Sequence, residues 1–521
     1  KHRAQLEHRV TNTESQTYHK KKSKMASNTG VPVEVLAKLK SDFTSDKKNL
    51  LAQNVCSNYD PLEMCLSREA VQGDHHIYNC KVNPEVKPVT NQKSSGRCWI
   101  FAALNAIRQQ FIRSKNIDSF EFSQIHLFFW DKIERANYLL DAYEDAARTE
   151  GATSRTMMFL MTEPSNDGGQ WHMLVNLITK HGLMPKSAWS DTHSATSSRR
   201  MNSMINTKMR SFAKRIVDLV RDEVSKDEMK KVKQEMLSEI YGLVSICLGT
   251  PPDTFQWEYY DNCKKYCKVD QITPLEFYEK HVKPVFNVED KVCFVNDPRP
   301  DNGYNKLYSV KYLGNMTGQK TVYLNQPVEV LKYLAVASIK SNEVVWFGCD
   351  VGKHFDRKLG LLSFDIHDYR LTFNLTLPAL NKSDRLLFGE SLMTHAMALT
   401  GVSIEETEKE KEPEKKATEE PTKESEVKQN ETSETNQVEE KVSLQPVRTT
   451  KWRVENSWGD DKGDKGYVMM SDEWFSEFVY EVVVDKKFVP EEIMDILQQE
   501  PIILPPWDPM GSLACRDCGR D

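Results

Sequence analysis

The sequence predicts an α+β fold, because helical and strand-like patterns occupy different parts of the chain. Apolar residues recur at helical spacing after Cys98, and again in two stripes within residues 201–248. Short β-branched and aromatic runs, separated by glycine, asparagine and aspartate, occupy residues 291–402. Segregated helical and strand-rich regions are typical of α+β proteins.

Composition narrows the class of protein. The chain has 521 residues, enough for several structural units, and a formal net charge of −6, which does not favour a strongly basic nucleic-acid-binding protein. No apolar run approaches the roughly 18 residues of a membrane span, and no signal-peptide core is visible. We therefore expect a cytoplasmic protein without membrane contact, whose 11 cysteines are reduced.

The first 30 residues are expected to be a disordered leader. Residues 1–24 are polar, and the first methionine is Met25. We interpret this stretch as read-through of an untranslated region. A basic arm and an organelle-targeting segment are the alternatives, but Glu7 and Glu14 are unusual in a targeting peptide.

Residues 31–198 are expected to form a mainly helical lobe. Its main feature is a helix with Cys98 in the first turn and Gly96 in the turn that leads into it. The apolar positions that give this helix its spacing are Ile100, Leu104, Ile107 and Phe111.

Residues 199–285 are expected to form an inserted helical subdomain. Two apolar stripes on a charged background predict two helices, the second after polar residues 225–231. The stripes comprise Met201, Met204, Ile205, Met209 and Phe212, then Val232, Met236, Ile240 and Leu243. Cys263 and Cys267 are assigned to a polar helical stretch of this subdomain. A zinc site there, or at Cys515 and Cys518, would lack a second ligand pair, so we expect no metal.

Residues 286–403 and 446–500 are expected to form a β-rich lobe. A helix is predicted at Val328–Ile339, and a strand buried on both faces at Leu392–Val402. The other predicted strands are Val292–Val295, Leu307–Tyr312, Val322–Leu324 and Val344–Phe347.

Residues 404–445 interrupt this lobe. The segment is dominated by glutamate, with lysine, proline, threonine and serine and no aromatic residue. It has too few apolar side chains to offset its ordering entropy, so we expect a disordered acidic insertion. A single acidic helix is the alternative, because glutamate and lysine are good helix formers.

Four residues suit nucleophilic catalysis by a thiol. The start of a helix and a neighbouring histidine both favour the reactive thiolate, so Cys98 is a candidate nucleophile and His395 its partner. Asn456 can orient the imidazole ring through its amide. The backbone N–H of Cys98 and the side chain of Gln92 can donate to an oxyanion. A lone buried cysteine or histidine is more often a core residue, and only the combination favours catalysis.

The motifs around these residues resemble those of papain-like cysteine peptidases. Gln92 and Cys98-Trp99 resemble the Q-x5-C-W signature, His395 lies in a segment similar to the family's histidine strand, and Asn456-Ser457-Trp458-Gly459 resembles its N-S-W-G motif. All three occur in the family's order. The resemblance implies a two-lobed papain-like fold with the site between the lobes.

Three further segments resemble the bleomycin hydrolase branch, which includes the bacterial aminopeptidase C enzymes. They are residues 166–171, 184–189 and 504–511. The resemblance implies a homohexameric cage and no cofactor. It also implies that the backbone of Gly168-Gly169 pairs with an extended substrate, which the absence of Cβ atoms would permit, although a plain turn is the alternative.

Two features depart from that branch. His395 and Asn456 lie 61 residues apart, further than in the family. The acidic insertion accounts for the excess, and lengthening a loop costs only about 0.6 kcal/mol per doubling. The resemblance also implies a C-terminal arm, residues 501–521, that lies in the active-site cleft. Its terminal carboxylate, at the position of Ala514, would hold the substrate's free amine, yet seven residues follow here.

The sequence therefore predicts a cytosolic cysteine aminopeptidase that acts on peptides with a free N-terminus. An endopeptidase is the nearest alternative, and it would need the arm displaced. A cage whose main role is nucleic-acid binding is the alternative from another class, and the negative net charge argues against it.

Overall fold

The computed structural model describes residues 30–73, 75–318, 320–377, 380–405 and 447–513. The chain divides into two compact units. The first comprises Lys1–Val71 and His367–Pro378, and the second Gln72–Ile366 and Ala379–Asp521. The expected leader, most of the acidic insertion and Ala514 lie outside the described residues. The lobe boundaries expected from the sequence remain a prediction.

The first unit is built from short helices. They are α2 (Val33–Ser45), α3 (Lys47–Cys56), α4 (Pro61–Met64), α5 (Arg68–Val71) and α15 (Tyr369–Phe373). Asp60 caps α4 by accepting from the backbone N–H of Leu62 at 2.7 Å. The return segment is held by a hydrogen bond of 2.7 Å from the N–H of Asp368 to the carbonyl of Cys65.

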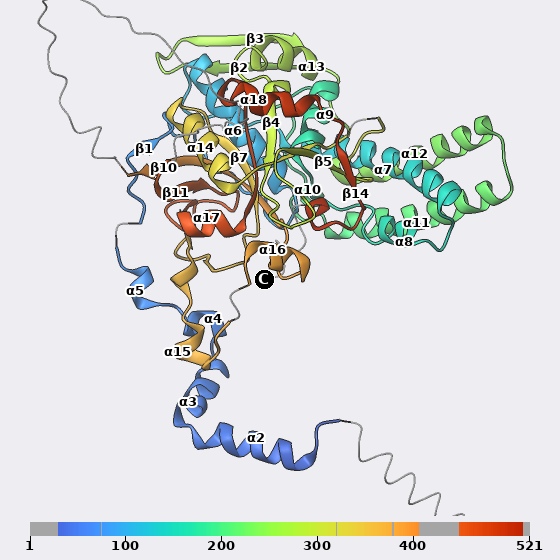
Figure 1. Cartoon of the computed structure of the whole chain (residues 1–521). Helices are drawn as coiled ribbons and strands as arrows, with labels where there is room; N and C mark the ends of the chain where they lie inside the picture. The colour runs from blue at the N-terminus through green and yellow to red at the C-terminus, as the bar shows by residue number, and fades with distance from the viewer. Residues whose placement is uncertain (1–29, 74, 319, 378–379, 406–446, 514–521) are drawn as a thin grey trace, which may run out of the picture. The chain divides into compact units, whose positions relative to one another are not determined.

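One mixed sheet organises the second unit (Figure 1). Among the described residues it contains twelve strands, in the order β14-β5-β6-β4-β13-β7-β10-β11-β12-β9-β8, with β1 paired to β10. The strands are β1 (Cys80–Lys81), β4 (Lys291–Val295), β5 (Lys306–Val310), β6 (Tyr323–Asn325), β7 (Val345–Cys349), β8 (Phe355–Asp356), β9 (Leu361–Leu362), β10 (His395–Ile404), β11 (Thr449–Glu455), β12 (Tyr467–Ser471), β13 (Val479–Asp485) and β14 (Ile502–Leu504).

The centre of this sheet positions the candidate site. β10 pairs antiparallel with β7, with His395 opposite Cys349, and antiparallel with β11, with Ala398 opposite Glu455. Helix α6 packs against both β10 and β7. The start of α6, the start of β10 and the end of β11 are therefore brought into one region.

The second unit also contains six helices of more than ten residues among the described residues. They are α6 (Cys98–Lys115), α7 (Gln124–Thr149), α9 (Trp171–His181), α11 (Arg199–Arg221), α12 (Lys226–Leu248) and α14 (Val328–Lys340). Short helices are α8 (Arg155–Leu160), α10 (His193–Thr196), α13 (Pro274–Phe277), α16 (Lys382–Leu387), α17 (Asp472–Phe478) and α18 (Glu491–Met494). Helices α11 and α12 form a hairpin that packs on α7 (Figure 1).

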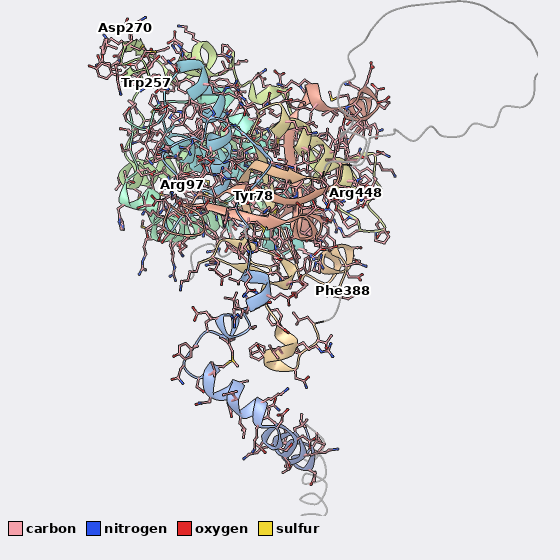
Figure 2. The ribbon with its side chains drawn as sticks, turned by 90° about the vertical axis from the view of Figure 1, so that its left-hand side faces the viewer. Tyr78, Arg97, Trp257, Asp270, Phe388 and Arg448 are labelled. Atoms are coloured by element: carbon pink, nitrogen blue, oxygen red, sulfur yellow. The ribbon has the colours of Figure 1, made fainter. Side chains whose placement is uncertain are left out.

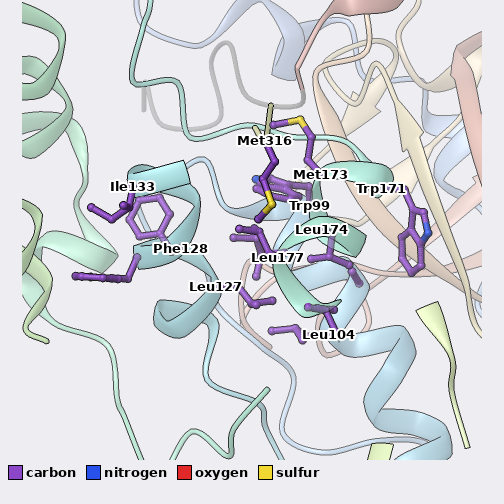
Figure 3. Packing of buried hydrophobic residues seen from close by; sticks show 14 of the residues in the cluster. Trp99, Leu104, Leu127, Phe128, Ile133, Trp171, Met173, Leu174, Leu177 and Met316 are labelled. Atoms are coloured by element: carbon purple, nitrogen blue, oxygen red, sulfur yellow. The ribbon is translucent and has the colours of Figure 1, made fainter. Parts of the chain in front are cut away.

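Buried side chains of α6, α7 and α9 form one core under the candidate nucleophile. Trp99 belongs to the same buried cluster as Met173, Leu174 and Leu177 of α9 (Figure 3). Helix α6 has 14 buried residues, including Cys98 at its first position. Burial on nearly every face fixes the start of this helix by packing.

Most predicted elements are confirmed. The helix starting at Cys98, the helix near 328–339 and the two helices within 201–248 are all present. Three boundaries were wrong. The strand expected at Leu307–Tyr312 is β5, which ends at Val310 because the chain turns there and Tyr312 takes a φ of 61°. α12 begins at Lys226, because the Ser225 side chain caps it, and so includes the polar residues expected to precede it. β10 begins only at His395, and further upstream the backbone N–H of Leu392 donates to the Asp350 carboxylate at 3.4 Å instead of to a neighbouring strand.

The helical assignment of Cys263 and Cys267 was wrong. This region is an antiparallel hairpin of β2 (Phe255–Tyr260) and β3 (Tyr266–Ile272), with Cys263 in the turn and Cys267 in β3. Its aromatic residues favour a strand, and Trp257 stacks on Tyr259 with ring centroids 4.2 Å apart. Figure 2 shows Trp257 and Asp270 at the edge of the second unit, with Arg97 further inside.

Within the described ranges, no helix is both long and apolar enough to cross a membrane.

Gly182 offers a test of the packing between α9 and α13. It ends α9 at φ 69° and ψ −161°, a region open essentially to glycine, and a Cβ there would lie 2.1 Å from the carbonyl oxygen of Pro274. We expect Gly182→Ala to lower the free energy of unfolding by about 1–3 kcal/mol from backbone strain alone. In the matched variant Gly242→Ala, in the interior of α12, the Cβ meets nothing within 4 Å, and stability should rise by about 0.5–1 kcal/mol. Thermal unfolding of both variants measures the contrast, and equal stabilities would contradict it.

Candidate active site

Helix α6 presents Cys98 at its N-terminus. The N–H groups of a first helical turn have no acceptor within the helix, and the helix dipole is positive at that end. Cys98 is fully buried, and the next residue ties the helix to the sheet, because the indole N–H of Trp346 on β7 donates to the carbonyl of Trp99 at 3.2 Å. The start of α6, which carries Cys98, is thus tied to the sheet.

His395 and Asn456 meet at the adjoining ends of β10 and β11. The Nε2 atom of His395 lies 3.0 Å from Oδ1 of Asn456, and both side chains are buried. The indole of Trp458 lies beside the imidazole, with ring centroids 5.0 Å apart. Asn456 also accepts from the N–H of Ser457 at 2.8 Å, which fixes its amide oxygen toward the histidine.

Gln92 is held from two directions. Its amide oxygen accepts from the hydroxyl of Ser457 at 2.6 Å, and its amide nitrogen donates to the carbonyl of Ser95 at 2.7 Å. Its backbone N–H donates to the carbonyl of Ser457 at 2.8 Å. The carboxamide therefore has one orientation, between the loop before Cys98 and the residue after Asn456.

Asp350 anchors the segment that leads into His395, and sequence reasoning missed it. Its carboxylate accepts from the hydroxyls of Ser391 at 2.8 Å and Thr394 at 3.2 Å. Burial raises the pKa of Asp350, and these hydrogen bonds partly offset the rise. A solitary aspartate gives no sequence signal for this role, because its partners lie some forty residues later.

A buried ion pair connects α6 to the strand that carries Asn456. The Arg108 guanidinium donates to the Glu455 carboxylate at 2.8 Å and to the carbonyl of Pro88 at 2.9 Å. Burial raises the pKa of Glu455, and Arg108 counteracts the rise. The residue next to Asn456 is thereby tied to the helix that begins with Cys98.

The predicted substrate-binding pair, Gly168 and Gly169, lies against the residue that follows Cys98. A Cβ on Gly169 would lie 2.6 Å from the indole of Trp99, so only glycine allows this approach. The carbonyl of Gly168 accepts from Arg135 of α7 at 2.7 Å. The close contact explains the second glycine independently of any substrate.

The C-terminal arm runs past the same region. β14 pairs in parallel with β5, and Asp508 accepts two hydrogen bonds, of 3.1 and 2.7 Å, from Arg299. The carbonyl of Ser512 accepts from Gln170 at 2.8 Å, and its hydroxyl donates to the carbonyl of Met393 at 2.9 Å. The arm is therefore fixed between the residue after the glycine pair and a residue just before His395.

A cavity of about 600 Å³ adjoins this end of the arm. Its walls include Phe159 and Leu160 of α8, Leu392, Trp507 and Leu513. Apolar side chains with a few polar groups at the rim are typical of sites that take organic ligands.

The described part of the chain holds no group of three histidine, cysteine, aspartate or glutamate side chains placed to bind a metal ion. Cys515 and Cys518 lie outside the described residues.

The structure brings Gln92, His395 and Asn456 into one network, with Ser457 as the link. Cys98 begins the helix that packs on the histidine strand, and the glycine pair contacts Trp99. Ser457 lies within the N-S-W-G motif, but its bond to a residue 365 positions away could not be derived from the sequence. Ala514 lies outside the described residues, and its assigned role remains a prediction.

Comparison with known proteins assigns the chain to a family. A model of the Peptidase C1-like family matches residues 30–428 and 415–511. The chain belongs to this family. Bleomycin hydrolase of Rattus norvegicus is 50% identical over 489 residues, which cover 94% of this chain and 100% of the relative. Bleomycin hydrolase of Homo sapiens is 50% identical over 490 residues, covering 94% and 100%.

Relatives at lower sequence identity support the same family assignment. Aminopeptidase C of Streptococcus thermophilus is 35% identical over 489 residues, which cover 94% of this chain and 100% of the relative. The crystal structure of PepW from Lactobacillus rhamnosis superimposes with a TM-score of 0.81 at 35% identity, covering 93% of this chain and 100% of that one. The fold is the papain-like α+β fold that the sequence motifs predicted.

The role of Gln92 as an oxyanion donor can be tested by comparing the loss of its side chain with the loss of one hydrogen bond that orients it. We expect Gln92→Ala to lower kcat by roughly 10²–10³ with little change in KM, as loss of one oxyanion donor does. Ser457→Ala keeps that donor and removes one orienting hydrogen bond, worth about 1 kcal/mol, or roughly fivefold in kcat. Steady-state kinetics on a peptide amide measure both. If Ser457→Ala were as inactive as Gln92→Ala, the assignment of Gln92 as the donor would be wrong.

Proposed function

We propose that the protein is a cysteine-type aminopeptidase that releases N-terminal residues through a covalent thioester intermediate. The observation that carries the proposal is the network at the ends of β10 and β11, where His395 lies 3.0 Å from Asn456 and Ser457 orients Gln92. The helix whose first residue is Cys98 packs on β10, the strand that begins with His395.

The reaction begins with the thiolate. His395 takes the Cys98 proton, and because its Nε2 is engaged by Asn456, the other ring nitrogen is the one that exchanges protons with the sulfur. The thiolate attacks the carbonyl carbon of the first peptide bond. The N–H of Cys98 and the second amide hydrogen of Gln92 donate to the oxyanion, since Ser95 occupies the first.

The acyl-enzyme then forms and is hydrolysed. His395 gives its proton to the departing amine, and the C–N bond breaks to leave a thioester on Cys98. The imidazole next takes a proton from water, which attacks the thioester and releases the N-terminal residue as a carboxylate. The thiol is regenerated with no external cofactor.

Restriction to the chain end is assigned to the C-terminal arm. Gln170 and Met393 hold Ser512, so the chain that follows leaves from a point beside the glycine pair and His395. A terminal carboxylate near Ala514 would pair with the substrate's ammonium group. We prefer this reading to an endopeptidase because the arm is anchored beside the site.

The relatives suggest the substrate range. We propose hydrolysis of bleomycin-like amides, on the strength of the two relatives named bleomycin hydrolase. A homohexamer and a cytoplasmic location are proposed on the same resemblance. Analytical ultracentrifugation tests the oligomer.

The aminopeptidase proposal is tested with paired fluorogenic amides that differ only in a free or acetylated amine. Wild type should turn over the free-amine substrate much faster. Cys98→Ala should abolish turnover because the nucleophile is gone, and Asn456→Ala should lose less activity than His395→Ala, because Asn456 only orients the ring. Activity retained in Cys98→Ala would reject the nucleophile, and equal rates on the two amides would reject the aminopeptidase.

The tail gives a second prediction. We propose that the residues after Ala514 continue past Cys98, where tethering would give them a high effective concentration, so we expect self-cleavage within 514–521. Intact mass spectrometry should show wild type several residues shorter than Cys98→Ala. Equal masses would exclude self-processing. An untrimmed wild type with full preference for free amines would reject the role of the carboxylate.

A further inference from the structure

Asp167 connects two segments whose relative position matters for the proposed reaction. One is the nucleophile loop, residues 95–99, and the other is the glycine pair that immediately follows Asp167. The backbone carbonyl of Asp167 accepts from the indole N–H of Trp99 at 2.7 Å, and the same indole covers Gly169. Asp167 therefore contacts the nucleophile loop through its main chain as well as its side chain.

Four donors converge on the buried carboxylate. Oδ2 accepts from the backbone N–H of Gly96 at 3.2 Å and from the hydroxyl of Ser198. Oδ1 accepts from Lys132 at 2.6 Å and from the amide nitrogen of Asn202 at 2.7 Å. Burial opposes ionisation, but the Lys132 charge and these hydrogen bonds outweigh it, so the pKa of Asp167 is lowered.

The donors come from three different parts of the second unit. Gly96 lies two residues before Cys98, Lys132 is on α7, and Ser198 and Asn202 lie at the start of α11. The start of the inserted helix hairpin is thus linked to the nucleophile loop through the Asp167 carboxylate.

We infer that Asp167 is a positioning residue, which sets the distance between the Cys98 nucleophile and a peptide bound along Gly168-Gly169. The decisive contact is the one with Gly96, because a backbone N–H can only donate. A shift of this loop by 1 Å would misplace both the sulfur and the Cys98 oxyanion donor, and misplacements of that size can cost about 10²-fold in rate. The inference rests on the proposed aminopeptidase function.

The geometry predicts how an amide would behave at this position. An asparagine has one acceptor oxygen and one donor nitrogen, so it cannot serve both pairs of donors. In Asp167→Asn the buried Lys132 ammonium should draw the oxygen to its own side. The amide nitrogen then opposes the Gly96 N–H, and the nucleophile loop loses its anchor.

Removal of the Lys132 charge should restore the hydrogen bond from Gly96 in the asparagine variant. In Lys132→Met/Asp167→Asn, no charge competes for the oxygen, and it can turn to Gly96. In Lys132→Met/Asp167→Leu, the ion pair is equally absent, but no acceptor exists. The two double variants have side chains of similar size at residue 167 and differ in whether it can accept from Gly96 and from the neighbouring donors Ser198 and Asn202, so they form a matched pair.

We expect Asp167→Asn to lower kcat by roughly 10–100-fold with a smaller change in KM. Lys132→Met/Asp167→Asn should recover most of that loss, and Lys132→Met/Asp167→Leu should not, with the two double variants differing by at least about tenfold in kcat at similar Tm. Asp485→Asn, which breaks the remote ion pair with Lys291, should keep wild-type kcat. Equal kcat in the two double variants, or a fully active Asp167→Asn, would overturn the inference.

Hydrogen exchange at the Gly96 amide provides a readout that needs no substrate. Exchange measured by mass spectrometry over residues 95–99 should be at least about tenfold faster in the Leu double variant than in the Asn double variant, because only the latter keeps an acceptor. Equal exchange rates in the two double variants would show that residue 167 does not accept a hydrogen bond from the Gly96 N–H. If wild type showed no aminopeptidase activity, the proposed function would be rejected. The hydrogen-exchange experiment would still decide whether Asp167 anchors Gly96.

Discussion

The antiparallel pairing of β10 with β7 and β11 is the constraint on which the site depends. It sets His395 at one strand end and Asn456 just beyond the adjacent one, although 61 residues separate them in sequence. Three further contacts of the site are made to these strands. Helix α6 packs on β10 and β7, the Arg108–Glu455 ion pair ties that helix to β11, and Asp350 accepts hydrogen bonds from the segment that leads into β10.

Some of this could be read from the sequence because the signals are local. The apolar spacing after Cys98 predicted a buried helix with the cysteine at its start, and that is where α6 begins. Strand-like runs in 291–402 predicted the sheet. The local motifs also singled out Gln92, His395 and Asn456, which the structure connects through Ser457.

The rest could not be predicted, because it depends on partners distant in the chain. Nothing local to Asp167 indicates that Gly96, Lys132, Ser198 and Asn202 converge on it. The hairpin at 255–272 was missed for a different reason. Its polar, cysteine-containing turn suggested a helix, whereas cross-strand aromatic contacts such as Tyr260–Tyr266 stabilise the paired strands.

The direction of β10 and β11 places the candidate site at one end of these strands and their connection at the other end. His395 begins β10, and the strand ends at Ile404, nine residues and about 30 Å further along. β11 starts at Thr449 and ends beside the site, so the connection between the strands joins their far ends. The points at which an insertion attaches, Ile404 and Thr449, therefore lie a full strand length from His395 and Asn456. This connection is therefore a natural acceptor site for added sequence, in evolution or in protein engineering, where a tag or a second domain can be grafted without altering the catalytic geometry.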